Sequence, residues 1–180
     1  MRWSEIERHQ PGLAELARKR LLDPGVVLVV TIRRDGTPRL SPVEPFVMDG
    51  ALWLSMMWQS KKATDLLRDP RILVHSVITN RDGSEGEVKI RGIARAENDA
   101  AVQRRYAAEI VQSFGWDPQV GLFHLFEVSA EHLTYIRYDP VTEHQHVAMW
   151  PPAREFIRQH ATATSLADPE PAADIISSRG

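Results

Sequence analysis

The stretch from Ser41 to Pro70 constrains the fold more than any other part of this 180-residue chain. It reads SPVEPFVMDGALWLSMMWQSKKATDLLRDP, in which Asp49-Gly50 is a hairpin signal between two apolar runs. The pattern predicts a strand, a tight turn and a second strand over residues 51–57. Ser60 is a good N-cap and Asp69-Pro70 is a stop signal, so a short helix is expected between them.

Two lysines, Lys61 and Lys62, occupy the first turn of this expected helix. The first backbone N–H groups of a helix lack internal partners and carry the positive end of the helix dipole, so they attract anions and disfavour cations. A phosphate bound between the lysines and the Ser60 hydroxyl explains their position. Two solvated surface lysines explain it as well, and the three residues alone leave both interpretations open.

Composition excludes several classes of function. The chain has 22 Lys plus Arg against 24 Asp plus Glu, so no overall positive field favours nucleic acid or an anionic membrane as a partner. It has no Cys, which excludes disulfides, thiolate catalysis and iron–sulfur clusters. No apolar run has the length of a membrane span and no signal-peptide pattern is present, so a cytoplasmic location is expected.

The remaining sequence predicts a small antiparallel barrel of the α+β class, with six or seven strands. Periodic apolar residues predict an N-terminal helix from residue 4 to about 20, divided by Pro11, and a crossing helix from about 99 to 113. Strand patterns cover residues 26–32, 38–43, 72–78, 87–97, 122–128, 132–138 and 143–150. A short helix containing Phe156 and Ile157 is expected after Pro151-Pro152.

The domain organisation expected from this pattern is simple. Residues 1–160 form one domain, because neither a repeat nor a linker interrupts them. Residues 161–180 are rich in Ala, Ser, Asp and Pro, which is typical of a flexible tail.

The order of motifs resembles a known family. The run TIRRDGTPRLSPVEPFVMDGALWLSMMWQSKKATDLLRDPRILVHS contains an Arg-x-Asp-Gly-x-Pro turn, a strand ending in Ser-Pro-Val, an Asp-Gly turn, a Ser-Lys-Lys helix start and an Asp-Pro-Arg-Ile strand. This series resembles the N-terminal half of the pyridoxamine 5'-phosphate oxidase-like, flavin-binding split-barrel superfamily, well over residues 25–97 and loosely to about 150. The resemblance implies a split β-barrel homodimer that binds FMN, or the deazaflavin coenzyme F-420, at the subunit interface.

The resemblance also implies which residues hold the cofactor. They lie on two strands, at the helix start and on a basic strand that faces the cofactor from the partner subunit: Arg39, Ser41, Val43, Ser55, Met56, Ser60, Lys61, Lys62, Lys89 and Arg91. Where family members often have Pro-Gly-Ser-Arg-Lys, this chain has Trp58-Gln59-Ser60-Lys61-Lys62, so an ammonium point charge replaces a bidentate guanidinium. A surface arginine, core methionine packing and a solvated strand face remain the alternative explanations for Arg39, Met56 and Lys89.

Two further patterns support the interface model. Lys89, Arg91 and Arg95 share one face of the expected strand 87–97 without an alternating acid, which favours an anion opposite them. The large apolar residues Trp53, Trp58, Trp116 and Phe123 exceed what one small barrel readily buries, which favours a dimer.

The function expected from the resemblance is an oxidoreductase acting on a small organic substrate. The cofactor supplies the ring chemistry, so no catalytic side chain is predicted. Pyridoxamine-phosphate oxidase activity itself is less expected, because it would also require a second set of basic residues to hold the substrate's phosphate. A non-catalytic cofactor-binding or sensing module and a heme-handling relative remain alternatives. His144 and His146 lack a third ligand at suitable spacing, so no metal site is expected.

Overall fold

The computed structural model describes residues 1–162, 164–172 and 175–176. Its helices are α1 (Trp3–His9), α2 (Pro11–Leu21), α3 (Lys61–Arg68) and α4 (Ala100–Phe114). Its longer strands are β1 (Val27–Ile32), β2 (Pro38–Val43), β3 (Pro45–Met48), β4 (Ala51–Met57), β5 (Arg71–Ser76), β6 (Glu87–Glu97), β7 (Phe123–Tyr138), β8 (Gln145–Trp150) and β9 (Arg154–Arg158). Three short strands follow, β10 (His160–Thr162), β11 (Ser165–Leu166) and β12 (Glu170–Pro171).

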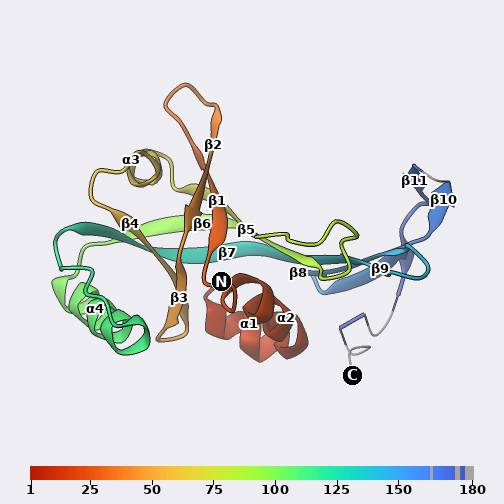
Figure 1. Cartoon of the computed structure of the whole chain (residues 1–180), viewed down its shortest axis with the longest axis horizontal. Helices are drawn as coiled ribbons and strands as arrows, with labels where there is room; N and C mark the ends of the chain where they lie inside the picture. Colours follow the sequence, from red (N-terminus) through yellow and green to blue (C-terminus); the bar gives the residue numbers. More distant parts are fainter. Residues whose placement is uncertain (163, 173–174, 177–180) are drawn as a thin grey trace.

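One branched antiparallel sheet organises these elements. Its main order is β12-β9-β8-β7-β6-β5-β1-β2, and the β3–β4 hairpin joins it because β4 also pairs with β7. Strand β7 crosses the whole molecule (teal in Figure 1) and pairs with β6 along one edge. Its other edge pairs first with β4 and then with β8. Because β2 and β4 also come into contact, the part of the sheet that contains β1 to β7 closes into a split β-barrel.

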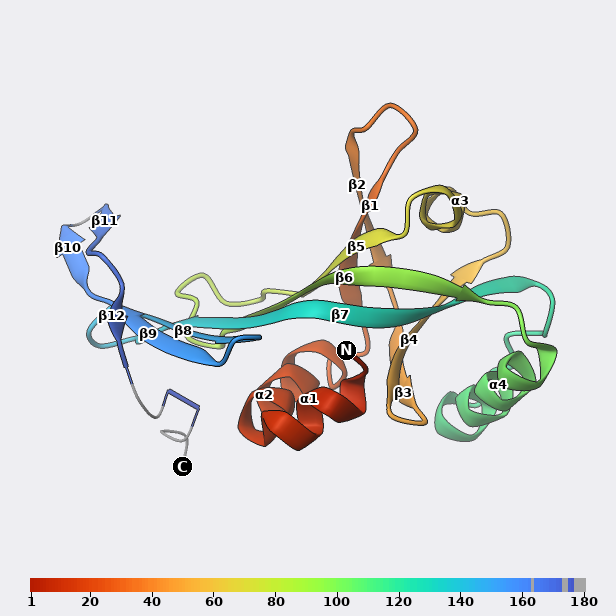
Figure 2. The ribbon, with the colours of Figure 1, turned by 180° about the vertical axis from the view of Figure 1, so that it is seen from behind.

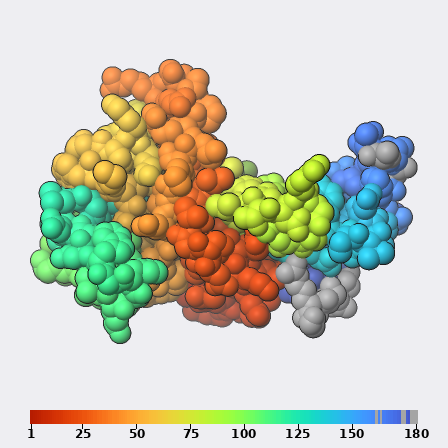
Figure 3. Space-filling view, viewed as in Figure 1, coloured from red at the N-terminus to blue at the C-terminus, as the bar shows by residue number. Residues whose placement is uncertain are grey.

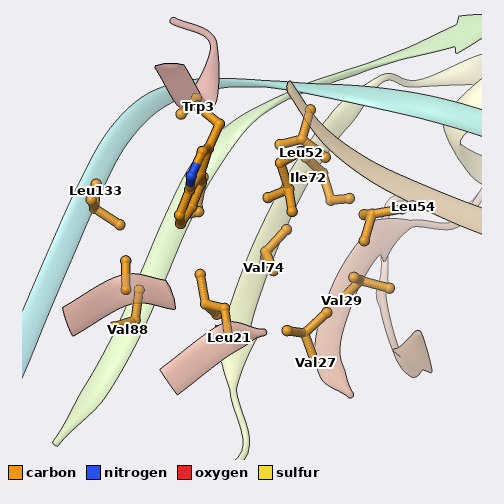
Figure 4. Close-up of a cluster of buried hydrophobic side chains, with 14 of the residues drawn as sticks. Trp3, Leu21, Val27, Val29, Leu52, Leu54, Ile72, Val74, Val88 and Leu133 are labelled. Atoms are coloured by element: carbon orange, nitrogen blue, oxygen red, sulfur yellow. The ribbon is translucent and has the colours of Figure 1, made fainter. Parts of the chain in front are cut away.

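The N-terminal helices α1 and α2 cover one end of this barrel, as the sequence predicts (Figures 1 and 2). Their apolar faces bury Trp3 and Leu21 almost completely. Figure 4 shows these two side chains among Val74, Val88 and Leu133, which come from three different strands. Burial of such large apolar side chains stabilises a fold by about 1.5–3 kcal/mol each, so the helices are part of the main core.

A second, smaller core lies under α4. Asp99 caps the start of α4, since its carboxylate accepts a hydrogen bond from the Ala101 N–H at 2.7 Å, and Gly115 caps the end of the helix in the left-handed conformation. Tyr106 and Ile110 face inward from α4 and pack with Trp53 of β4 and other buried residues. Helix α4 therefore crosses beside the β3–β4 hairpin (green in Figure 1) and not over the main core.

Two expectations about the C-terminal half are wrong. Residues 122–128 and 132–138 belong to one continuous strand, β7, because a bulge absorbs the irregularity between them: Arg91 pairs with His132 and Gly92 with Ala130, so Glu131 is the extra residue. The backbones are close at this bulge, where a Cβ on Gly92 would clash with the Ser129 carbonyl oxygen. The segment containing Phe156 is strand β9 and not a helix, since it pairs with β8.

The described chain has more strands than the six or seven expected, because β9 and the short strands β10–β12 extend the sheet beyond the barrel. The predicted flexible tail, residues 161–180, lies partly outside the described residues. Within the described part, β10 pairs with β11, β12 pairs with β9, and Ile175 is buried. The flexibility of the tail and the domain limit at residue 160 stay predictions. In the described ranges, none of the helices combines the length and apolar character that a membrane crossing requires.

Candidate functional site

A cavity of about 370 Å³ lies between the ends of β2 and β4, the start of α3 and the segment that follows α4. Four of the predicted site residues line it: Val43, Ser55, Met56 and Lys62. The other lining residues are Val26, Pro42, Glu44, Met57, Trp116, Pro118, Leu122 and Phe123. Figure 3 shows the segment after α4 (green to teal) next to the yellow surface of α3. A larger hollow of about 610 Å³ lies at the far end of β8 and β9, but none of the predicted site residues lines it.

Strand β4 forms the floor of the cavity. Its residues Ser55 and Met56 pair with Leu125 and His124 of β7, so their positions are fixed by two neighbouring strands. The Ser55 side chain hydrogen-bonds the Tyr106 hydroxyl, and burial raises the pKa of Tyr106, which therefore stays neutral. The floor thus combines a polarizable thioether with a fixed, uncharged polar pair.

The start of α3 carries an unsatisfied hydroxyl. Ser60 has N-cap backbone geometry, and its carbonyl oxygen accepts a hydrogen bond from Thr64 N–H at 2.9 Å. Its side chain makes no capping bond, and Ser60 Oγ is buried without a hydrogen-bond partner among the described residues. An unsatisfied buried polar group costs about 1–3 kcal/mol, and an anion oxygen at this helix start would supply the missing partner.

The two lysines flank this hydroxyl differently. Lys62 lines the cavity, and its Nζ donates a hydrogen bond to the Pro42 carbonyl oxygen at 3.0 Å. Lys61 is exposed. The prediction that Ser60, Lys61 and Lys62 begin a helix is confirmed, while their role in holding a phosphate stays a prediction.

Arg39 is tied to helix α3 within the chain. Its Nε donates to Asp65 Oδ2 at 2.6 Å, and Thr31 Oγ1 donates to the same oxygen at 3.0 Å. Asp65 is buried, and its other oxygen lies 3.5 Å from Arg68 Nη1. Burial acts to raise the pKa of Asp65, but the bonds from Arg39 and Thr31 outweigh it and hold that pKa below its ordinary value. This cluster fixes α3 against β1 and β2. Ser41, which is half-buried, lies two residues from Arg39 on the same face of β2.

The basic row on β6 has acidic neighbours, contrary to expectation. Lys89 Nζ lies 2.6 Å from Glu87 Oε1, and Arg91 Nε lies 3.7 Å from Glu131 Oε2. Glu87 shares the strand face, and Glu131 is the extra residue of the β7 bulge. Neither Lys89 nor Arg91 lines the cavity of its own chain, so their contact with a cofactor in a partner subunit stays a prediction.

Sequence reasoning missed the wall contributed by the connection between α4 and β7. Trp116, Pro118 and Leu122 line the cavity from this connection. The connection matches no motif, and the only signal of a binding wall was the presence of aromatic residues beside Gly115 and Pro118. Of the large apolar residues expected to favour a dimer, Trp53 and Phe123 are buried in the second core. Trp58 and Trp116 are exposed at 53% and 43%, and Trp58 stacks on His124 at 4.3 Å between ring centroids.

No group of three or more His, Asp or Glu side chains within the described ranges is arranged to hold a metal ion. His146 lies on β8, whereas His144 precedes that strand. Within the described residues, the candidate functional site is therefore the cavity beside α3, which residues predicted from the sequence line.

A barrel in which β4 pairs with β7 and contacts β2, with a helix start beside the cavity, defines the class of split β-barrel proteins. The family model for pyridoxamine 5'-phosphate oxidase matches residues 13–137, and the chain belongs to this family. A comparison with curated proteins finds no significant match.

Solved structures share the fold. A conserved hypothetical protein from Mycobacterium tuberculosis is 22% identical with a TM-score of 0.57, over 67% of this chain and 81% of that one. A putative pyridoxamine 5'-phosphate oxidase from Listeria innocua is 14% identical with a TM-score of 0.56, over 68% and 94%. The heme storage protein HutZ from Vibrio cholerae is 16% identical with a TM-score of 0.54, over 73% and 92%. At these identities the similarity concerns the fold alone.

The turn before α3 contains a residue with a strained backbone, Gln59. Gln59 has a φ of 56°, in the left-handed region, and the Ser60 N–H donates to the Met57 carbonyl oxygen at 3.0 Å across this turn. A left-handed backbone costs a residue with a Cβ about 1–2 kcal/mol, and glycine does not carry this cost. Gln59→Gly should therefore raise the free energy of unfolding by up to about 1 kcal/mol, the remainder being offset by the greater entropy of an unfolded glycine. Urea denaturation measures the difference, and a less stable variant contradicts the assignment of strain to this residue.

A second prediction concerns Asp65. Asp65→Asn leaves Arg39 without its charged partner, and breaking a largely buried pair should cost about 2–4 kcal/mol near neutral pH. Because the folded-state pKa is lowered, the stabilisation by Asp65 is present above the ordinary pKa of 3.8 and is lost as pH falls through the folded value. The stability difference from the unmodified protein should therefore shrink in acid. Denaturation curves at several pH values test this, with the exposed Asp23→Asn as control; a difference that stays constant with pH would refute the charged pair.

Proposed function

We propose that this protein is a flavin- or deazaflavin-dependent oxidoreductase that acts on a small organic substrate. The observation that carries the proposal is the buried, unpartnered Ser60 hydroxyl at the start of α3, with Lys61 and Lys62 beside it and a cavity of about 370 Å³ adjoining. FMN is the first candidate cofactor and coenzyme F-420 the alternative, since both carry a phosphate next to the ribityl-type chain.

The residues present fit such a group. Ser60 Oγ and the free N–H groups of the first α3 turn would hold the phosphate, and the two lysines would neutralise its charge. Val43, Ser55 and Met56 would line the ring system, and Ser41 and Arg39 lie on the strand above the same helix. When bound, the flavin-type ring supplies hydride or electron transfer. The side chains bind it, orient it and exclude water, and none is assigned as an acid or base.

The third prediction separates the phosphate contact from the ring contact. In the Lys62→Ala variant, FMN should bind about tenfold to a hundredfold more weakly, because one charge-assisted contact contributes about 1.5–3 kcal/mol and 1.4 kcal/mol is a factor of ten. The Lys61→Ala/Lys62→Ala double variant should bind FMN at least as weakly. Riboflavin, which lacks the phosphate, should bind both variants and the unmodified protein alike. Flavin fluorescence titration measures both, and coenzyme F-420 is titrated in parallel.

Lys19→Ala, an exposed lysine on α2, is the matched control and should leave FMN affinity unchanged. Equal FMN and F-420 affinity in the double variant and the unmodified protein rejects the phosphate placement. The visible spectrum of the purified protein adds an independent check: a Soret band in place of a flavin or deazaflavin band would favour heme handling instead.

The fourth prediction concerns the subunit interface. We infer a homodimer, because Met57, Trp58 and Leu122 expose large apolar surface around the cavity mouth, and contiguous exposed apolar surface is typical of interfaces. Light scattering at micromolar concentration should give twice the chain mass. Arg91→Glu should weaken cofactor binding and reduce its dependence on salt, because it reverses a charge facing the partner's cofactor. A monomeric protein would disprove the interface. If Arg91→Glu changes neither cofactor affinity nor its salt dependence, the basic row on β6 is only a solvated strand face.

A further inference from the structure

A second cavity of about 240 Å³ adjoins the first, beneath the C-terminal end of α4. Its walls are almost entirely apolar or aromatic: Leu22, Gly25, Pro45, Phe46, Tyr106, Ile110, Phe114 and Trp116. Phe46 is central to it, because its ring meets the Tyr106 ring edge-on at 5.9 Å and the Phe114 ring at 6.0 Å between centroids. Three rings from two elements thus hold each other in fixed orientations around the hollow.

One charged residue, Glu44, completes this lining. It lies between β2 and β3, with Pro42 two residues before it and Pro45 directly after it, so its backbone has little freedom. Within the described ranges its carboxylate takes part in no salt bridge or side-chain hydrogen bond. Lys62 shares the first cavity with Glu44 but its Nζ is directed to the Pro42 carbonyl oxygen. The lining of the second cavity therefore includes one carboxylate, on an exposed side chain, and no cationic side chain.

Such a lining discriminates by charge. Aromatic faces carry negative electrostatic potential and attract cations within about 6 Å of the ring centre. A carboxylate at the same cavity adds a direct Coulomb attraction, and it repels an anion of the same shape. The volume lies below the range of about 300–1,000 Å³ that is usual for drug-sized ligands, so the cavity suits a molecule of one or two rings.

We propose that this cavity binds a small, flat heteroaromatic cation, with its rings among Phe46, Phe114 and Trp116 and its charge next to Glu44. Glu44 and Trp116 also line the first cavity. A cation held here borders the space assigned to the cofactor, so we assign aromatic cations as the class of substrate. This role as substrate rests on the proposed function, whereas the binding of the cation does not.

The test compares three ligands of nearly one shape on the cofactor-free protein. N-methylquinolinium carries a permanent positive charge, quinoline is neutral at a pH above neutrality, and quinoline carboxylate is negative. Titration calorimetry, together with quenching of tryptophan fluorescence, should rank the cation first and the anion last. In Glu44→Gln the affinity for N-methylquinolinium should fall about two- to fivefold, as expected for an exposed charge contact, while that for quinoline stays unchanged.

Glu15→Gln, an exposed acid on α2, is the matched control and should change neither affinity. Phe46→Leu should weaken both the cation and quinoline, because it removes a ring that both contact. Circular dichroism of each variant verifies that it is folded.

Three results overturn the inference: equal affinity for the cation and quinoline, no effect of Glu44→Gln on the cation, or no binding of any of the three. The last is also the result expected where a second copy of the chain covers the aromatic wall. Failure of the proposed function is distinguishable, because N-methylquinolinium then still binds a protein that binds neither FMN nor coenzyme F-420. Retained FMN binding without cation binding rejects this inference alone.

Discussion

The shared use of strand β7 is the constraint on which the rest of the structure depends. One edge of β7 is occupied by β6 from Leu125 to Ile136, while the other edge is divided between β4 and β8. In the interval between those two partners, the Ala130 N–H donates to the Met1 carbonyl oxygen at 2.9 Å, so the backbone groups there are not left open. The barrel and the C-terminal extension are thus two halves of a single hydrogen-bonded system (Figure 2).

Helix α3, beside the cavity, is held to the barrel by the polar contacts of Asp65. Helix α3 presents only a few apolar side chains to the barrel, Ala63 and Leu66 among them. The contact between buried Asp65 and the Arg39 and Thr31 side chains adds direction to that packing, because hydrogen bonds depend on angle whereas apolar contact does not. The helix start therefore faces the same cavity as the end of β4, which apolar packing alone would not ensure.

Local patterns in the sequence predicted much of this arrangement. The Asp49-Gly50 turn and the 87–97 strand lie where expected, because turn chemistry and alternation act between near neighbours in the chain. Long-range register was not accessible in this way. The continuity of β7 depends on a bulge that places Glu131 next to Arg91, and only the pairing with β6 determines it. For the same reason four lining residues of the candidate site were predicted, whereas the Trp116 wall was not.

The pairing of β4 with β7 also determines when the cavity can form during folding. Its floor depends on contacts such as that between Met56 and His124, which close a loop of about 70 residues. Hairpins between adjacent strands, such as β3 with β4, require only a two-residue turn and close first. The cavity is thus assembled by non-local contacts, the kind that slow folding. A chain emerging from the ribosome carries the residues of α3, with its lysines, long before β7 completes the space that they border.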